Sequence, residues 1–304
     1  MINYPEIERR NNLNPPEFFR NYVGKKAVIM SGLVTDWLAV TKWNKNYFYQ
    51  AAAEKKILIE IVNSLLSKKE IRLVSLKDYI SQVLDKNPSA ENKEPRYFYD
   101  SPLPSLLTSL KHDMEPFPLK FFPKWYRSEW WKNLFFFSTQ PETLIPMHFD
   151  GLGTHNTYFH LKGRKKFIII SPEYINGCYR YDYNAFQVDP EQPDLHKHPL
   201  FKNVQPQQAY LSPGDVLYLP PYTLHQVKSI DACLSVKLDW HTAKSIVVSF
   251  KNLYHGISAA DAYYNFIFSL GILFKIPARF LYPQYKKSLS RLRHSIYCVN
   301  AKNF

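Results

Sequence analysis

Three residues carry side chains that together suit a metal ion. His148 and Asp150 lie two positions apart in Leu-Ile-Pro-Met-His-Phe-Asp, and His225 stands far along the chain in Thr-Leu-His-Gln-Val. In a strand, residues two apart point to the same face, so His148 and Asp150 can hold one ion while Phe149 points away. Two imidazoles and one carboxylate form the facial triad that binds non-haem Fe(II) and leaves positions open for chemistry. The alternative is two loop histidines with a surface aspartate.

The segment before His225 suits a third ligand that must come from a strand nearby in space. Residues 211–220 read Leu-Ser-Pro-Gly-Asp-Val-Leu-Tyr-Leu-Pro, which predicts a turn at Pro213-Gly214-Asp215 followed by a short buried strand. A His-x-Asp motif alone occurs often by chance. Combined with this turn, strand and histidine, it predicts a metal site.

The elements that must position these residues are short strands. From Leu134 onward, apolar runs separated by turn residues predict strands over 134–138, 146–150, 157–161, 165–170, 208–211, 216–219, 225–228 and 233–238. This pattern is typical of an all-β barrel or sandwich. One excursion, residues 176–204, is long enough to be expected as a lid or binding loop.

Mixed elements flank the strand-rich part. Before it, the pattern predicts helices over 14–23, 47–53 and 75–84, and strands over 26–32, 57–62, 71–74 and 96–99. After it, helices are expected over 246–254, 259–274 and 288–299, too apolar to stand alone. We therefore divide the chain into an N-terminal part (1–133), a β core (134–241) and a C-terminal helical extension (242–304).

Composition limits the class of protein. The chain has 304 residues, 16% aromatic residues and 9 glycines, as expected of a globular fold. Three unpaired cysteines, with no apparent signal peptide or membrane span, predict a cytoplasmic, reducing location. The net charge of +13 is spread along the chain, so it indicates either a solvated lysine-rich surface or a partner such as RNA or an acidic polypeptide.

The stretch from Pro146 to Trp240 resembles the JmjC/cupin-like Fe(II)/2-oxoglutarate oxygenases, in particular the hydroxylase branch with factor inhibiting HIF and the tRNA wybutosine hydroxylase. The resemblance rests on the His-Phe-Asp motif, Leu161-Lys-Gly-Arg-Lys-Lys-Phe-Ile-Ile-Ile-Ser-Pro172, Pro213-Gly-Asp-Val-Leu-Tyr-Leu-Pro220 and His225-Gln-Val227. It implies an all-β core, the double-stranded β-helix of the cupin/jelly-roll class, with the N-terminal α/β elements and C-terminal helices around it.

The resemblance also implies residues for the cosubstrate, 2-oxoglutarate. Lys165 corresponds to the basic residue that holds the far carboxylate, with Lys166 as its rival on the opposite face. Asn156 falls where relatives have a polar residue near the cosubstrate, and Tyr97 or Tyr99 would supply a hydroxyl. In three places the chain departs from the pattern.

The first departure is Lys237, which stands where relatives often have asparagine and would either offer the keto acid a second cation or point away. The second is Ile145, which replaces a hydroxyl residue. The third is Thr223-Leu224, which replaces the aromatic pair that commonly precedes the last histidine.

The resemblance therefore implies a dioxygenase that uses Fe(II), 2-oxoglutarate and O2, with His148, Asp150 and His225 as metal ligands and catalytic residues. We expect hydroxylation of a protein or peptide side chain, with demethylation as a less favoured outcome. RNA is the alternative substrate, and a catalytically silent cupin-like binding protein is the alternative of another class. Relatives often pair through C-terminal helices, which predicts a homodimer.

Overall fold

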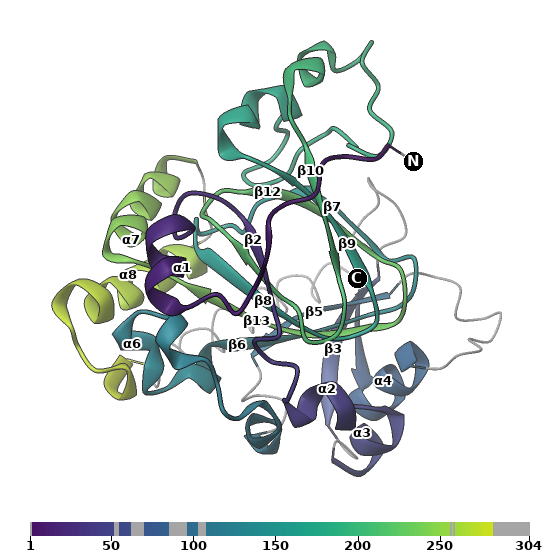
Figure 1. Cartoon of the computed structure of the whole chain (residues 1–304), viewed down its shortest axis with the longest axis vertical. Coiled ribbons are helices and arrows are strands. Elements are labelled where there is room, and N and C mark those ends of the chain that lie inside the picture. The colour runs from purple at the N-terminus through teal and green to yellow at the C-terminus, as the bar shows by residue number, and fades with distance from the viewer. Residues whose placement is uncertain are drawn as a thin grey trace, which may run out of the picture.

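Two facing β-sheets form the centre of the protein (Figure 1). The structure is a computed structural model that describes residues 2–51, 55–61, 70–84, 96–102, 108–255, 257 and 259–281. Its strands are β1 (Arg9–Asn11), β2 (Val28–Ser31), β3 (Lys56–Ile61), β4 (Glu70–Ser75), β5 (Arg96–Pro102), β6 (Leu134–Thr139), β7 (Leu144–His148), β8 (His155–Lys162), β9 (Lys165–Ile170), β10 (Gln207–Leu211), β11 (Val216–Leu219), β12 (Leu224–Ser229) and β13 (Cys233–Trp240).

The smaller sheet has the order β10-β9-β12-β7, and the larger has the order β1-β2-β11-β8-β13-β6-β5-β3-β4. All pairs of neighbours are antiparallel except β1 and β2. Chain neighbours β8 and β9 lie in different sheets, as do β11 and β12. This alternation between two sheets produces the jelly-roll core, and it confirms the predicted fold class.

Helices cover the larger sheet and its edges (Figure 1). They are α1 (Pro15–Asn21), α2 (Leu38–Lys42), α3 (Lys45–Ala51), α4 (Leu76–Leu84), α6 (Lys124–Arg127), α7 (Ala243–Ser249) and α8 (Ala259–Phe274), with 3-10 turns η2 (Thr108–Met114), η3 (Leu119–Phe121), η4 (Trp130–Asn133), η5 (Pro172–Cys178), η6 (Pro199–Asn203) and η7 (Phe250–His255). The Asn14 side chain caps α1, because it accepts a hydrogen bond from the Glu17 amide.

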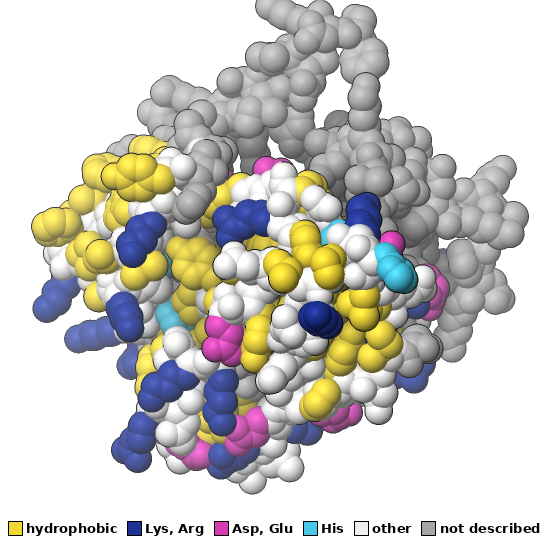
Figure 2. Space-filling view, turned by 90° about the horizontal axis from the view of Figure 1, so that it is seen from above, with side chains coloured by type: hydrophobic (Ala, Val, Ile, Leu, Met, Phe, Trp, Pro, Cys, Tyr) yellow, Lys and Arg dark blue, Asp and Glu magenta, His cyan; other side chains and the backbone are white. Residues whose placement is uncertain are grey.

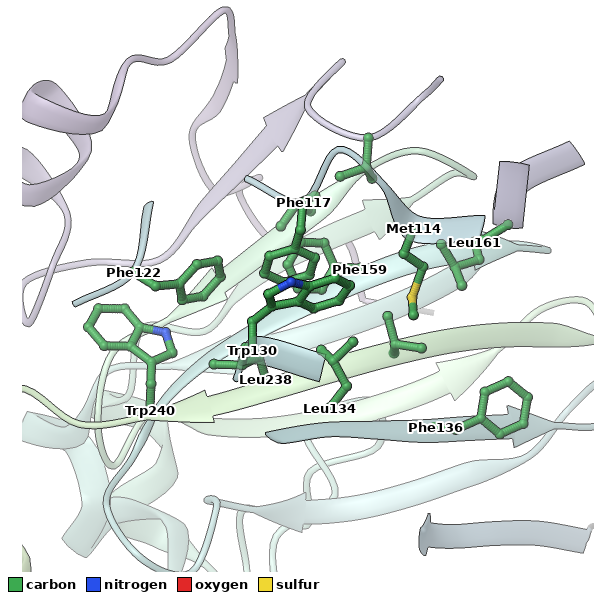
Figure 3. Close-up of a cluster of buried hydrophobic side chains, with 14 of the residues drawn as sticks. Met114, Phe117, Phe122, Trp130, Leu134, Phe136, Phe159, Leu161, Leu238 and Trp240 are labelled. Atoms are coloured by element: carbon green, nitrogen blue, oxygen red, sulfur yellow. The ribbon is translucent and has the colours of Figure 1, made fainter. Parts of the chain in front are cut away.

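The main core lies between the larger sheet and the helices. Aromatic side chains dominate it: the Phe117 and Trp130 rings stack with centroids 4.0 Å apart, and Phe159 of β8 packs against Phe117 (Figure 3). A second cluster fills the space between the two sheets and includes Tyr158, Phe167 and Val227. The first cluster fixes the outer face of β8 and β13, so their inner faces are held toward the second sheet.

The C-terminal helices follow the predicted pattern, with α8 over the expected range and α7 followed by η7 instead of one continuous helix. Hydrophobic side chains are exposed there, and Figure 2 shows them gathered at its left edge, where α7 and α8 lie in Figure 1. Val247, Leu253, Phe266 and Phe274 are more than half exposed. The homodimer stays a prediction, and the helix expected over 288–299 lies outside the described residues.

Within the described residues, no helix is both long and apolar enough to cross a membrane. One strand prediction is wrong in its bounds: β7 ends at His148, so Asp150 stands in the turn that follows and not in the strand.

Candidate active site

The three predicted metal ligands lie together at one end of the smaller sheet. His148 is the last residue of β7, and His225 on β12 is its direct partner across the two antiparallel strands. Asp150 follows two residues after the strand end. One ligand atom from each of the three lies within 4.8 Å of the others. The register of β7 and β12 therefore joins residues far apart in the sequence.

Both imidazoles are oriented by their own backbone. His148 Nδ1 lies 2.7 Å from the Pro146 carbonyl oxygen, and His225 Nδ1 lies 3.0 Å from that of Thr223. A carbonyl only accepts, so each Nδ1 carries the hydrogen and each Nε2 keeps its lone pair for a ligand. Burial is the largest cause that lowers the pKa of His148 to about 3, and the neighbouring His225 is the second cause. Burial is also the main cause that lowers the pKa of His225. Both rings are therefore neutral, as metal binding requires.

The Asp150 carboxylate is held in its charged form. Burial alone would raise its pKa, but the Lys237 ammonium, the two histidines and Asn156 bring the pKa below the usual range. Lys237 Nζ donates to Asp150 Oδ1 at 3.2 Å, and Asn156 Nδ2 donates to Asp150 Oδ2. Asn156 Oδ1 is buried and has no hydrogen-bond partner among the residues that the structure describes, so it can still accept from an incoming group.

Polar side chains line the inner face of β8 and β13, starting at Asp150. Asn156, Tyr158 and His160 alternate along β8, and across the ladder their respective partners on β13 are Asp239, Lys237 and Ser235. We call these six residues the polar strip. One end of it contacts Asp150 through Asn156 and Lys237, and the other end leads to Lys165.

Lys165 is at the far end of the strip from Asp150. It is 2% exposed, and Nζ donates to the Tyr158 hydroxyl at 2.7 Å. None of the ion pairs formed by the described residues includes Lys165. A buried ammonium without a carboxylate partner is unfavourable. Its position therefore suits an anion that enters the barrel.

The rival, Lys166, points to the opposite face of β9. Its Nζ forms an ion pair with Glu191 at 2.7 Å, and its side chain is 5% exposed. Because this ammonium already has a carboxylate partner, Lys165 is the better candidate for a cosubstrate. The side chains of the other two candidates, Tyr97 and Tyr99, lie outside the described residues, although their strand, β5, pairs with β6.

Lys237 points toward the candidate metal ligands. Its ammonium lies between Asp150 Oδ1 and Asp239 Oδ2, 3.2 Å and 3.0 Å away, and the residue is 7% exposed. Of the two orientations expected from the sequence, the structure has the one that faces the site. Ile145, another of the departures, packs against the apolar cluster between the sheets.

Part of the long excursion is bound to the strand that carries His148. Backbone hydrogen bonds join Phe186 N to Met147 O and Phe149 N to Asn184 O, at 3.1 Å each. The Tyr183 hydroxyl also donates to the Gly151 carbonyl. The segment predicted as a lid therefore packs over the turn between His148 and Gly151 and helps to hold Asp150 in place.

The donor set fits Fe(II). Two neutral imidazole nitrogens and an ionised carboxylate are borderline and hard donors of the kind this ion accepts, and three protein ligands leave positions for a keto acid and O2. Among the described residues, no other group of histidine, cysteine and acidic side chains has this arrangement. The same side chains would accept other divalent ions, so the assignment of the metal remains part of the proposal below.

Sequence reasoning gave no role to Tyr158 and Ser235. Alternation along the predicted strand 157–161 is enough to place Tyr158 on the same face as Asn156 and His160. Ser235 has no such signal, because its place opposite His160 depends on the register of β8 and β13. That ladder contains an irregularity between Leu234 and Ser235, which sequence patterns do not reveal.

Comparison with known proteins supports one family. A family model described as a cupin-like domain matches residues 15–246. The chain is 27% identical over 223 residues to "Jumonji C domain-containing protein 5" of Drosophila melanogaster, covering 70% of this chain and 54% of that protein. It is 26% identical over 232 residues to "Lysine-specific demethylase 8" of Xenopus tropicalis, covering 74% and 50%.

A third relative matches over most of its length. The chain is 24% identical over 253 residues to "tRNA wybutosine-synthesizing protein 5" of Gallus gallus, with 77% of each protein covered. By contrast, the chain spans about half the length of the two relatives named above. The whole-protein activities in these names therefore enter only as sources for a proposal.

Proposed function

The chain belongs to the cupin-like domain family, and from its site we propose that it is an Fe(II)- and 2-oxoglutarate-dependent dioxygenase. The observation that carries the proposal is the pairing of two features at opposite ends of the polar strip. At one end two neutral imidazoles and a carboxylate converge within 4.8 Å. At the other, a buried ammonium has no acidic partner among the described residues. A metal-bound keto acid with a second carboxylate matches both ends.

Each residue has a stated role in this proposal. His148, Asp150 and His225 hold the iron, and Lys165 neutralises the far carboxylate of 2-oxoglutarate. The chemistry that iron, keto acid and O2 supply together is oxygenation of a C–H bond, with 2-oxoglutarate converted to succinate and CO2. Asn156 orients Asp150 through the hydrogen bond to its Oδ2. The apolar side chains between the sheets exclude water from the buried end.

We further propose that the substrate is a protein or peptide side chain and that the product is hydroxylated. Hydroxylation follows from the resemblance of the motifs to the hydroxylase branch. Demethylation is the same oxygenation at an N-methyl group, and one relative is named a lysine-specific demethylase. The position of the oxidised carbon therefore separates the two outcomes, and product analysis by mass spectrometry distinguishes them.

RNA is the second candidate substrate, and two observations favour it. The net charge is +13, and the relative named for tRNA wybutosine synthesis matches over 77% of both proteins. Basic proteins that bind nucleic acid release counterions, so their affinity falls steeply as salt rises. A steep salt dependence of tRNA affinity would support RNA as the substrate, whereas the absence of tRNA binding at physiological salt would exclude RNA as a candidate.

The proposal is tested by anaerobic titration of Fe(II) and 2-oxoglutarate into the metal-free protein. We expect a weak visible metal-to-ligand charge-transfer band that is lost in His148→Ala. His196→Ala is the matched control, because His196 is exposed and lies outside the triad. If the folded wild-type protein gives no band, the dioxygenase proposal fails, and a silent cupin-like binding protein becomes the better explanation.

A further inference from the structure

The ammonium of Lys165 begins a chain of four hydrogen bonds, of which the first three are buried and the last is partly buried. Lys165 Nζ is 2.7 Å from Tyr158 Oη, and Tyr158 Oη is 2.7 Å from Ser235 Oγ. Ser235 Oγ is 3.2 Å from His160 Nδ1, and His160 Nε2 is 2.8 Å from the Gly163 carbonyl oxygen. The chain ends at the turn that joins β8 to β9, only two residues from Lys165.

Each donor in this chain can be assigned. An ammonium only donates, so Tyr158 accepts from Lys165 and turns its own hydrogen toward Ser235. A carbonyl only accepts, so His160 carries its hydrogen on Nε2, and its Nδ1 accepts from Ser235. Burial is the largest cause that lowers the pKa of His160 to about 3, and the charge of Lys165 is the second cause. The ring is therefore neutral. The orientation of the Tyr158 hydroxyl is therefore set from both sides.

Apolar side chains pack around the Tyr158 ring. Tyr158 belongs to the cluster between the sheets, whose other members are apolar and include Phe167, Leu217 and Val227, with Ile145 packed against it. A buried carboxylate has about four acceptor sites, which a single ammonium does not satisfy. Among the described residues, the Tyr158 hydroxyl contacts the Lys165 ammonium and can act as a second hydrogen-bond donor to the carboxylate.

We propose that Tyr158 determines cosubstrate specificity by binding, together with Lys165, the far carboxylate of the keto acid. Its hydroxyl hydrogen turns from Ser235 to the carboxylate when the cosubstrate enters. Ser235 and His160 are positioning residues that keep the tyrosine oxygen beside Lys165. Because the two donors are held in fixed positions, they select a keto acid whose two carboxylates are as far apart as those of 2-oxoglutarate. This inference rests on the proposed function.

The test compares two keto acids on protein loaded with Mn(II) in the absence of O2. Isothermal titration calorimetry gives the affinity for 2-oxoglutarate and for pyruvate, which lacks the far carboxylate. In Tyr158→Phe we expect the affinity for 2-oxoglutarate to fall roughly 10- to 100-fold, the effect of losing one hydrogen bond to a charged group. The affinity for pyruvate should stay unchanged. Ser235→Ala keeps the tyrosine hydroxyl but removes its orientation, so it should produce a smaller loss in the same direction.

Tyr218→Phe is the matched control. Tyr218 is also fully buried in the larger sheet, but its hydroxyl contacts the Gly24 amide and His155 in the core outside the barrel. It should bind both keto acids like the wild type. Equal losses for both acids in Tyr158→Phe would show a merely structural role and overturn the inference.

A selective loss in Tyr97→Phe or Tyr99→Phe, with Tyr158→Phe unaffected, would also overturn the inference. It would leave the dioxygenase proposal standing. A wild-type protein that binds Mn(II) but neither keto acid would refute both, and so the two failures are distinguishable.

Discussion

At the scale of single residues, Lys237 decides the charge of the site. Its ammonium lies beside Asp150 and Asp239, so the three groups together carry one negative charge. A divalent cation that binds Asp150 must therefore approach a resident positive charge. The same ammonium offers an attraction to the anionic keto acid. Lys237 should thus oppose the metal and favour the cosubstrate.

Lys237→Met separates these two effects, because methionine keeps the apolar stem and removes the charge. We expect Mn(II) affinity to rise on the order of tenfold, since one unfavourable charge is lost and Asp150 is left without its ammonium. Affinity for 2-oxoglutarate should fall. Competition with a fluorescent chelator measures the first and calorimetry the second. Lys197→Met, an exposed control, should change neither; a weaker metal affinity in Lys237→Met would contradict the argument.

Residue type alone predicted part of the site. Motif and spacing predict His148, Asp150 and His225, whereas the family resemblance implies Lys165; the structure places the first three together and Lys165 buried. Their roles stay predictions until a ligand is measured. Tyr97 and Tyr99 stay predictions for the hydroxyl near the cosubstrate, and Tyr158, which the sequence did not single out, contacts Lys165. That contact depends on which side chains of two sheets meet inside the barrel, and no local pattern encodes it.

At the scale of elements, the turn between β8 and β9 positions Lys165. Gly163 has φ +78, a left-handed conformation that side chains other than glycine rarely adopt, and an added Cβ would meet the Ala232 carbonyl. Its own carbonyl accepts from His160. The turn therefore connects the backbone between the two sheets to the hydrogen-bond chain behind Lys165.

Gly163→Ala should destabilise the fold through both strain and contact. Gly32 is a matched control, because its φ is +79 and nothing lies within 4 Å of an added Cβ. Strain is common to the two variants, so we expect Gly163→Ala to lose about 1–3 kcal/mol more free energy of unfolding than Gly32→Ala, as overpacking does. Urea denaturation measures both. Equal losses would mean that the Ala232 backbone moves aside without penalty.

Elements were predictable where a periodic pattern was long. The helix over 259–274 and the strand over 165–170 have the predicted bounds, because each is set by a sustained apolar pattern and turn residues. The end of β7 was not predictable, since hydrogen bonds from residues 184–186 of the long excursion compete for the backbone around Phe149. Sequence alternation does not show such a competition between distant segments.

At the scale of the whole molecule, the fold keeps many histidines neutral by burial. Burial is the largest cause that lowers the pKa of His148, His155, His160 and His241, each to about 3, and it lowers that of His225 too. In the unfolded chain each imidazole has a pKa near 6.5. These five groups are spread over both sheets and the end of the β core. Any change in their protonation therefore acts on the folding of the entire domain.

The sign of the pH dependence follows from proton uptake. Below about pH 6.5 the unfolded chain binds protons on these histidines while the folded protein does not, so acid favours unfolding. Their contribution to stability is complete above that pH and is lost progressively as the pH falls toward 3. Each group contributes about 1.4 kcal/mol per pH unit in this range. The summed loss of stability from five such groups equals a typical free energy of unfolding within one or two pH units.

We therefore expect the free energy of unfolding of the metal-free protein, measured with urea, to fall steeply between pH 7 and pH 5. Lowered carboxyl pKa values act only at more acid pH, near the ordinary range of aspartate. His155→Phe tests the cause, because His155 stacks on Trp240 at 4.3 Å and lies outside the triad. Phenylalanine retains the stacking but takes up no proton, so the slope should fall by about 1.4 kcal/mol per pH unit. A flat profile in the wild type, or an unchanged slope in the variant, would show that the buried histidines do not control acid stability.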